Sequence, residues 1–324
     1  MQKTLVLLFL LILTYGCGLS TEEELDDAIT QAHRLLSSNK CGEAIAVLNG
    51  VGQQTSNADW LSAYASAQAC NAPWKVVTFF ATDLDKLSTA SSTAIVGSTA
   101  TFTQAVMTSP SDGAYTNLRA AINTLLAAGG ITTISYANRA AAIGTSKASN
   151  LAIQTLYLQL TQLGQFSRYY GNADQTTGTK GTGTNPSSNG CYINYTDNAA
   201  NGAQAYLTAV GALGTCDTFV EGNPDLTGNR ARLCEGIVLM NNFIDILTNV
   251  TLDPTGNNGN LGDLDELGTS IETACADANT NYGVDFGGTC TVKTQSICEN
   301  NADNTYNIEH LERYYAVIWE GLHQ

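Results

Sequence analysis

Cysteine is the residue type in this chain whose side chain could do the most chemistry, and the chain contains nine cysteines. No two of them stand as Cys-x-x-Cys, the spacing used by thiol–disulfide oxidoreductases, so redox catalysis is not indicated. Eight lie beyond residue 40, an even set that predicts about four structural disulfides in an oxidising compartment. The candidates are Cys41, Cys70, Cys191, Cys216, Cys234, Cys275, Cys290 and Cys298.

The ninth cysteine, Cys17, ends an apolar leader. Lys3 gives the leader a positive start, and residues 4–13 are almost all apolar. This pattern predicts a secretory signal peptide over residues 1–16, too short to span a bilayer.

The end of the leader resembles the lipobox of bacterial lipoproteins, in which a small residue such as Gly16 precedes the modified cysteine. Thr14 and Tyr15 depart from the usual pattern. The resemblance implies that the mature chain begins at Cys17 and carries acyl chains such as palmitate there, which also removes the odd thiol. Gly18 implies sorting to the outer membrane. The alternative is an ordinary signal peptide cut near Gly16 or Gly18.

Two short motifs resemble those of nucleophilic enzymes and phosphate-binding loops, but the residues around them do not fit either kind of site. Ser37-Ser38-Asn39-Lys40 matches the Ser-x-x-Lys string of penicillin-recognising enzymes, but it ends a predicted helix and lacks the companion motifs. Residues 178–183 contain glycines and a lysine without the order of a phosphate-binding loop. The sequence therefore predicts no enzymatic activity.

Metal and cofactor sites are not expected either. The three histidines, His33, His310 and His323, do not form a His-x-x-x-His pair. Residues 253–266 carry oxygen ligands that Ca²⁺ would accept, but without EF-hand spacing, so we interpret them as a polar surface loop.

Tyrosines flank a segment over residues 172–190 that is nearly all Gly, Thr, Ser and Asn. Because tyrosine is favoured at interfaces, these side chains form a possible binding surface. They are Tyr169, Tyr170, Tyr192 and Tyr195.

The segments that must position these residues mostly carry apolar side chains at helical spacing. Amphipathic stripes predict helices from residue 20 through 87, and Cys41 and Cys70 lie equidistant from the turn at 53–57, which predicts a disulfide across a helical hairpin. The small residues Ala32 and Ala44 fall where paired helices would cross. This opening resembles tetratricopeptide-like hairpins, and a non-repeat bundle is the alternative.

Further helices are expected over residues 114–128, 146–166, 199–213, 233–247 and 264–278, and near the C-terminus. Leu156, Leu158 and Leu160 alternate, which leaves a strand as an alternative there. Residues 88–112 lack clear periodicity. The midpoint argument also favours a disulfide between Cys216 and Cys234.

Together these patterns predict an all-α, disulfide-stapled protein. After a tether at 17–19, a helical domain would span 20–171, with the loop 172–190 leading to a cysteine-rich helical region at 191–324. With 29 acidic against 14 basic side chains, nucleic acid is not an expected partner.

The expected function is that of a non-enzymatic, lipid-anchored scaffold or protein-binding lipoprotein of the outer membrane, with the membrane and a protein as partners. The alternatives are a small-molecule or glycan-binding lipoprotein, and an envelope hydrolase with an unrecognised site.

Overall fold

The computed structural model describes residues 21–88, 92–184, 190–193, 203–211, 222–250, 265–300 and 302–323, and within these ranges every regular element is helical. The all-α prediction is confirmed. In order, the elements are α2 (Thr21–Ser37), α3 (Cys41–Gly50), α4 (Ala58–Asn71), α5 (Val76–Thr78), η1 (Phe79–Asp83), η2 (Leu84–Lys86), α6 (Ser92–Ala100), α7 (Gly113–Leu126), α8 (Tyr136–Ile143), α9 (Thr145–Tyr170), α10 (Ala203–Ala209), α11 (Arg230–Leu247), α12 (Asp265–Tyr282), α13 (Gln295–Glu299), α14 (Ile308–Tyr314), η5 (Tyr315–Trp319) and α15 (Glu320–Leu322).

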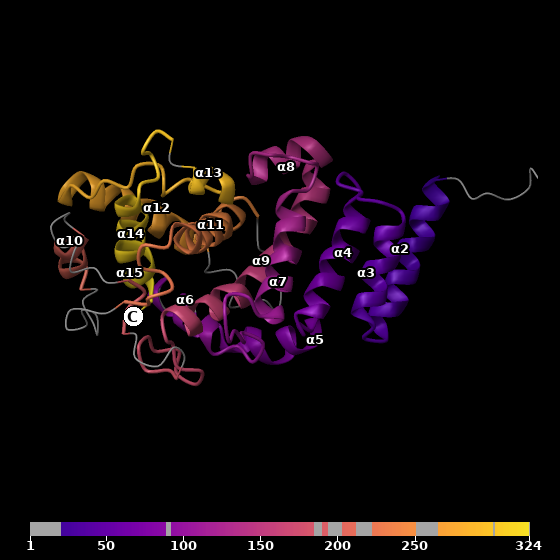
Figure 1. The fold of residues 1–324 in the computed structure, drawn as a ribbon, viewed down its shortest axis with the longest axis horizontal. Coiled ribbons are helices and arrows are strands. Elements are labelled where there is room, and N and C mark those ends of the chain that lie inside the picture. The colour runs from indigo at the N-terminus through magenta and orange to yellow at the C-terminus, as the bar shows by residue number, and fades with distance from the viewer. Residues whose placement is uncertain are drawn as a thin grey trace, which may run out of the picture.

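The first three helices form an array at one end of an elongated molecule (Figure 1). Cys41 at the start of α3 is bonded to Cys70 near the end of α4, with their Cα atoms 5.5 Å apart. Ala32 and Ala44 are fully buried, so small side chains lie where α2 and α3 pack together. The predicted disulfide is confirmed, and the tetratricopeptide-like character of the hairpins stays a prediction.

The end of the stretch predicted to be helical through residue 87 is divided into α5, the π-helical η1 and the 3₁₀-helical η2. The buried carboxylate of Asp83, at the end of η1, accepts the backbone N–H of Thr103 at 2.6 Å and that of Gln104 at 3.2 Å. These bonds satisfy backbone donors that follow α6. The helix type thus changes at Asp83, whose side chain accepts hydrogen bonds from the backbone after α6.

Helix α9 is the central element, and it contacts α4, α6, α7, α8 and α11. Because neighbours cover it on several sides, Leu156, Leu158 and Leu160 are all buried, and their alternation reflects a surrounded helix rather than a strand. Gly164 lets α9 approach α6 closely, because a Cβ there would lie 2.2 Å from the carbonyl oxygen of Thr99 in α6.

The C-terminal half packs around α11. Cys234 in α11 is bonded to Cys298 in α13, and Cys275 in α12 to Cys290. The predicted pairing of Cys216 with Cys234 is therefore wrong: Cys234 lies where α13 packs along α11, so its partner comes from a later segment. Cys191 is also disulfide-bonded, and Cys216 and Cys17 lie outside the described residues.

The described part of the Gly-rich segment is held in place rather than free. Lys180 is buried and forms an ion pair with Glu320 of α15. His323, fully buried, contacts the carbonyl oxygen of Gly178 through Nε2 at 2.8 Å. A single hydrophobic core cluster extends from Ile29 to Leu322, so the regions before and after this segment share one core.

Candidate functional site

A cavity of about 210 Å³ lies among α7, α9, α11 and the start of α13, and we call it the central cavity. Its lining combines buried polar side chains with aliphatic ones. Sixteen residues line it: Tyr115, Arg119, Ile122, Asn123, Leu126, Ala127, Ile134, Gln159, Gln162, Glu235, Val238, Leu239, Asn242, Lys293, Thr294 and Gln295.

Three amide side chains of the central cavity are at most 2% exposed: Gln159, Gln162 and Asn242. Both amide atoms of Gln159, Nε2 of Gln162 and Oδ1 of Asn242 have no hydrogen-bond partner among the described residues. A buried polar atom left without a partner costs about 1–3 kcal/mol. These atoms have less than 1 Å² of accessible surface each, so a polar molecule in the cavity supplies the missing partners once the amides rotate toward it.

The packing of α9 and α11 explains how these amides reach the same cavity. Gln159 and Gln162 are three residues apart on α9 and therefore share a face. Asn242 of α11 donates from Nδ2 to the carbonyl oxygens of Val238 at 2.9 Å and Lys293 at 2.8 Å. Those two acceptors fix the orientation of the Asn242 amide, and its oxygen Oδ1 is left without a hydrogen-bond partner among the described residues.

Glu235 is buried in the wall, and its charge is fully compensated. Arg119 contacts its Oε1 at 2.9 Å, Arg232 contacts its Oε2 at 2.7 Å, and the hydroxyl of Tyr115 donates to Oε1. Burial, and then the nearby Glu235 charge, raise the pKa of Tyr115 well above its usual value, so the phenol stays protonated. Both oxygens of Glu235 thus have partners within the protein.

Lys293 also lines the central cavity, and its Nζ is 3.0 Å from Oδ1 of Asp245. The other oxygen of Asp245 accepts the backbone N–H of Tyr136 at 2.6 Å and lies 3.7 Å from Arg139. The neighbouring Asn241 donates to the carbonyl oxygens of Thr289 at 2.8 Å and Val292 at 2.7 Å. Consecutive asparagines on α11 thus hold the segment that presents Lys293.

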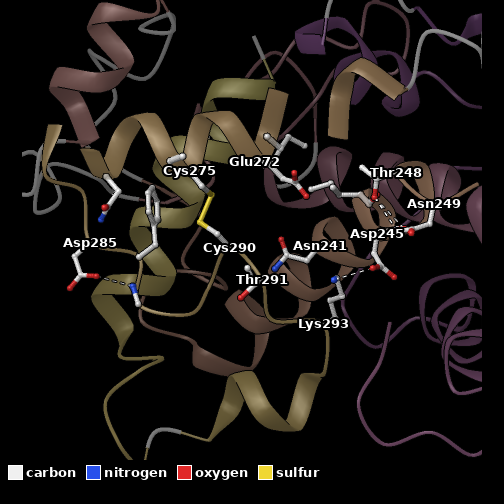
Figure 2. A pocket seen from close by; sticks show the side chains of 16 residues that line it. Asn241, Asp245, Thr248, Asn249, Glu272, Cys275, Asp285, Cys290, Thr291 and Lys293 are labelled. Carbon is white, nitrogen blue, oxygen red and sulfur yellow. Dashed lines mark hydrogen bonds and ion pairs between the residues drawn. A yellow bond between two sulfur atoms is a disulfide. The ribbon is translucent and has the colours of Figure 1, made fainter. Parts of the chain in front are cut away.

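A second, larger cavity of about 550 Å³ lies between α11 and α12, with the Cys275–Cys290 disulfide in its wall (Figure 2). Lys293 lines both cavities. Among the described residues, none that lines this cavity has a buried side-chain polar atom without a partner. Asn241 is bonded as described, and Asn249 donates to the carbonyl oxygen of Asp245 at 2.8 Å. The central cavity is therefore the better candidate site, although it is smaller.

The predicted tyrosine surface is wrong for the tyrosines that the structure describes. Tyr170 and Tyr192 are fully buried and Tyr169 is 9% exposed. The reason is that the chain after α9 folds back: Tyr192 packs against Trp319, with ring centroids 5.2 Å apart, and its hydroxyl lies 2.6 Å from Nδ1 of His323. Tyr195 lies outside the described residues.

The histidines occupy ordinary positions. His33 is exposed on α2, His323 is buried, and His310 contacts Asp285 at 3.2 Å. Within the described ranges, no three His, Cys, Asp or Glu side chains are grouped as metal ligands. The loop 253–264 lies outside those ranges.

Sequence reasoning missed the residues of the central cavity. A signal was present, because Gln159 and Gln162 interrupt a stretch whose leucines predict a buried helix. Polar residues in such a stretch are informative, since buried amides normally find partners.

No family model matches this chain, and comparisons with curated proteins and with solved structures likewise found no match. In the part of the chain that the structure describes, no helix has the length and apolarity needed to cross a membrane.

Proposed function

We propose that this protein is a binding protein for a small polar molecule, which it holds in the central cavity. One observation carries the proposal: buried amides line a cavity and lack partners within the protein. Binding sites for small molecules combine apolar walls with a few placed polar groups, and this cavity has both. Its volume of about 210 Å³ equals that of roughly seven water molecules, which limits the ligand to the size of a monosaccharide or an amino acid.

The charged groups of the cavity fit ligand binding better than catalysis. The Glu235 carboxylate already interacts with two arginines and a phenol. A general base needs an oxygen that is available to take up a proton, and both oxygens of this carboxylate already have partners. We therefore place the protein among binding proteins rather than enzymes.

A thermal-shift screen of small polar metabolites, followed by calorimetry on the hits, tests the proposal. A ligand at 100 times its Kd stabilises the folded state by about 2.7 kcal/mol, which a screen detects readily. Val238→Phe fills the cavity and should abolish the shift, whereas Val77→Phe, on an exposed side chain, should not. A screen without hits, or hits that Val238→Phe leaves unchanged, would refute the proposal.

We further propose that the mature chain is lipid-anchored at the outer membrane through Cys17. The leader and its resemblance to a lipobox support this assignment, as does the even number of remaining cysteines. Metabolic labelling with a fatty acid should mark the wild type and not Cys17→Ser, and the variant should leave the membrane fraction. Membrane retention of Cys17→Ser, with an unlabelled wild type, would exclude the anchor.

Protein binding by the helical hairpins is a second candidate function. The observation in its favour is that Val76, Val77 and Phe80, beside the first hairpins, are 53%, 74% and 40% exposed. Exposed apolar side chains that cluster in this way often mark contact surfaces. Cross-linking in membranes should then recover a stoichiometric partner from the wild type and not from Val77→Asp.

A further inference from the structure

We infer that the ligand of the central cavity is a small hydroxylated carboxylate, an anion of the size of a sugar acid. The inference rests on the proposed function and adds the charge of the ligand to it. It comes from the distribution of charge around the cavity, which is opposite in sign to that of the whole chain.

The whole chain is acidic, with a formal net charge of −15, yet the cavity lies in a cationic environment. Glu235 is paired with Arg119 and Arg232, and Asp245 with Arg139 and Lys293. Four cations thus surround two carboxylates. Of these groups only Arg119, Lys293 and Glu235 line the cavity, so its lining carries one positive charge in excess, which a bound anion can balance.

Two of these cations line the cavity and keep donors available. Arg119 is 29% exposed, and among the described residues its one ion pair uses Nη1, whereas a guanidinium has five N–H donors. Lys293 is 28% exposed and forms its ion pair with Asp245 through Nζ, which carries three donors. A carboxylate between them would receive charge-assisted hydrogen bonds.

The buried amides of the lining favour hydroxyl groups. Rotated toward the cavity, Gln159 would offer both a donor and an acceptor, Gln162 a donor and Asn242 an acceptor. A hydroxyl can donate and accept at once, so it suits mixed amide partners better than an apolar group does. Two cations and three amides in the lining of one cavity thus match a molecule that carries both a carboxylate and hydroxyls.

Calorimetric titration with three matched probes, D-galacturonate, D-galactose and D-galactosamine, tests the inference. We expect galacturonate to bind at least tenfold more tightly than either of the others, because only it carries the carboxylate. Equal or tighter binding of galactose or galactosamine would overturn the anionic assignment and leave the proposed function standing. Failure of all three to bind would overturn the inference, while the metabolite screen would still judge the proposed function independently.

Variants identify the groups responsible. Arg119→Gln should reduce the preference for galacturonate over galactose by about tenfold, and Arg119→Lys should restore part of it. Lys40→Gln, at a surface ion pair with Glu43, is the matched control and should change nothing. A preference that survives both Arg119→Gln and Lys293→Gln, in variants with wild-type circular dichroism, would contradict the inference.

Discussion

Gln159 and Gln165 are the same residue type on the same helix, and both are buried, yet their surroundings differ. Gln165 donates from Nε2 to the carbonyl oxygen of Val106 at 2.9 Å, whereas neither amide atom of Gln159 has a partner among the described residues. We predict that Gln159→Leu stabilises the ligand-free protein by about 1 kcal/mol, because it removes an unpaired buried amide. Chemical denaturation measures this change.

Gln165→Leu is the control for that prediction. It removes the hydrogen bond from Nε2 to the carbonyl oxygen of Val106 and should destabilise the protein by about 1 kcal/mol. Gln159→Leu should also weaken ligand binding, so a gain in stability and a loss of affinity are expected together. Destabilisation by Gln159→Leu comparable to that by Gln165→Leu would show that Gln159 has a structural role instead.

His323 makes stability depend on pH. Burial lowers its pKa to about 3 and the positive charge of Lys180 acts in the same direction, although the hydrogen bond to Gly178 opposes them. The unfolded chain has an ordinary histidine pKa of about 6.5, so between these values only the unfolded state takes up the proton. Stability from this group is complete above pH 6.5 and is lost as the pH falls towards 3, with a slope of up to about 1.4 kcal/mol per pH unit.

Denaturation curves recorded from pH 7 to pH 4 check this prediction. His323→Gln should lower the slope by nearly one proton, whatever it does to stability at pH 7. His33→Gln, at an exposed position, should leave the slope as it is. Equal slopes for the wild type and His323→Gln would show that His323 does not titrate in this window.

At the residue scale, the sequence identified residue types but not their surroundings. Tyr192 was expected at a surface because a polar segment flanks it, yet it lies against Trp319 of the C-terminal helix. Gln159 went unnoticed because burial on the polar face of α9 depends on neighbours that are distant in the chain. Local periodicity reports one buried face, and it does not report that a helix is covered on its other faces too.

At the scale of elements, α9 depends on a glycine where it crosses α6. A Cβ at Gly164 would lie 2.2 Å from the carbonyl oxygen of Thr99 and 2.8 Å from the side chain of Ala105. Because backbone cannot move aside cheaply, Gly164→Ala should destabilise the protein by about 1–3 kcal/mol. Thermal and chemical denaturation measure this loss.

Gly42, in α3, provides the comparison. A Cβ there would meet nothing within 4 Å, so Gly42→Ala should be neutral or stabilising by up to about 1 kcal/mol, through helix propensity alone. Similar effects of the two substitutions would mean that the close approach of α6 and α9 is not maintained in solution.

The helices were predicted well where neighbouring residues in the sequence determine them. The helices at 114–128 and 233–247 correspond to α7 and α11 within a few residues, because each combines an apolar stripe with clear ends. The Cys41–Cys70 disulfide follows from the same logic, since a single turn joins its two helices. The logic fails for Cys234, whose partner Cys298 is 64 residues away and is brought there by tertiary packing.

At the scale of the whole molecule, α9 joins the hairpins to the C-terminal half. It contacts α4 and α7 on one side and α11 on another, and the hydrophobic core cluster continues from Ile29 to Leu322. Disulfides hold both regions, but none of those described connects one region to the other. Cooperation between the two regions therefore depends on the packing of α9 against α11, on that of α6 against α15 and α12, and on the contacts of α7 with Glu235 of α11.

We predict that the oxidised protein unfolds in one cooperative transition, although the sequence suggests two regions. Trp60 reports on the hairpins and Trp319 on the C-terminal helix, and both are buried. Variants that keep only one of these tryptophans should give coincident denaturation curves by fluorescence. Gly164→Ala loosens α9, so it should shift both curves together, whereas separation of the Trp60 and Trp319 transitions in the wild-type background would show that the two regions fold independently.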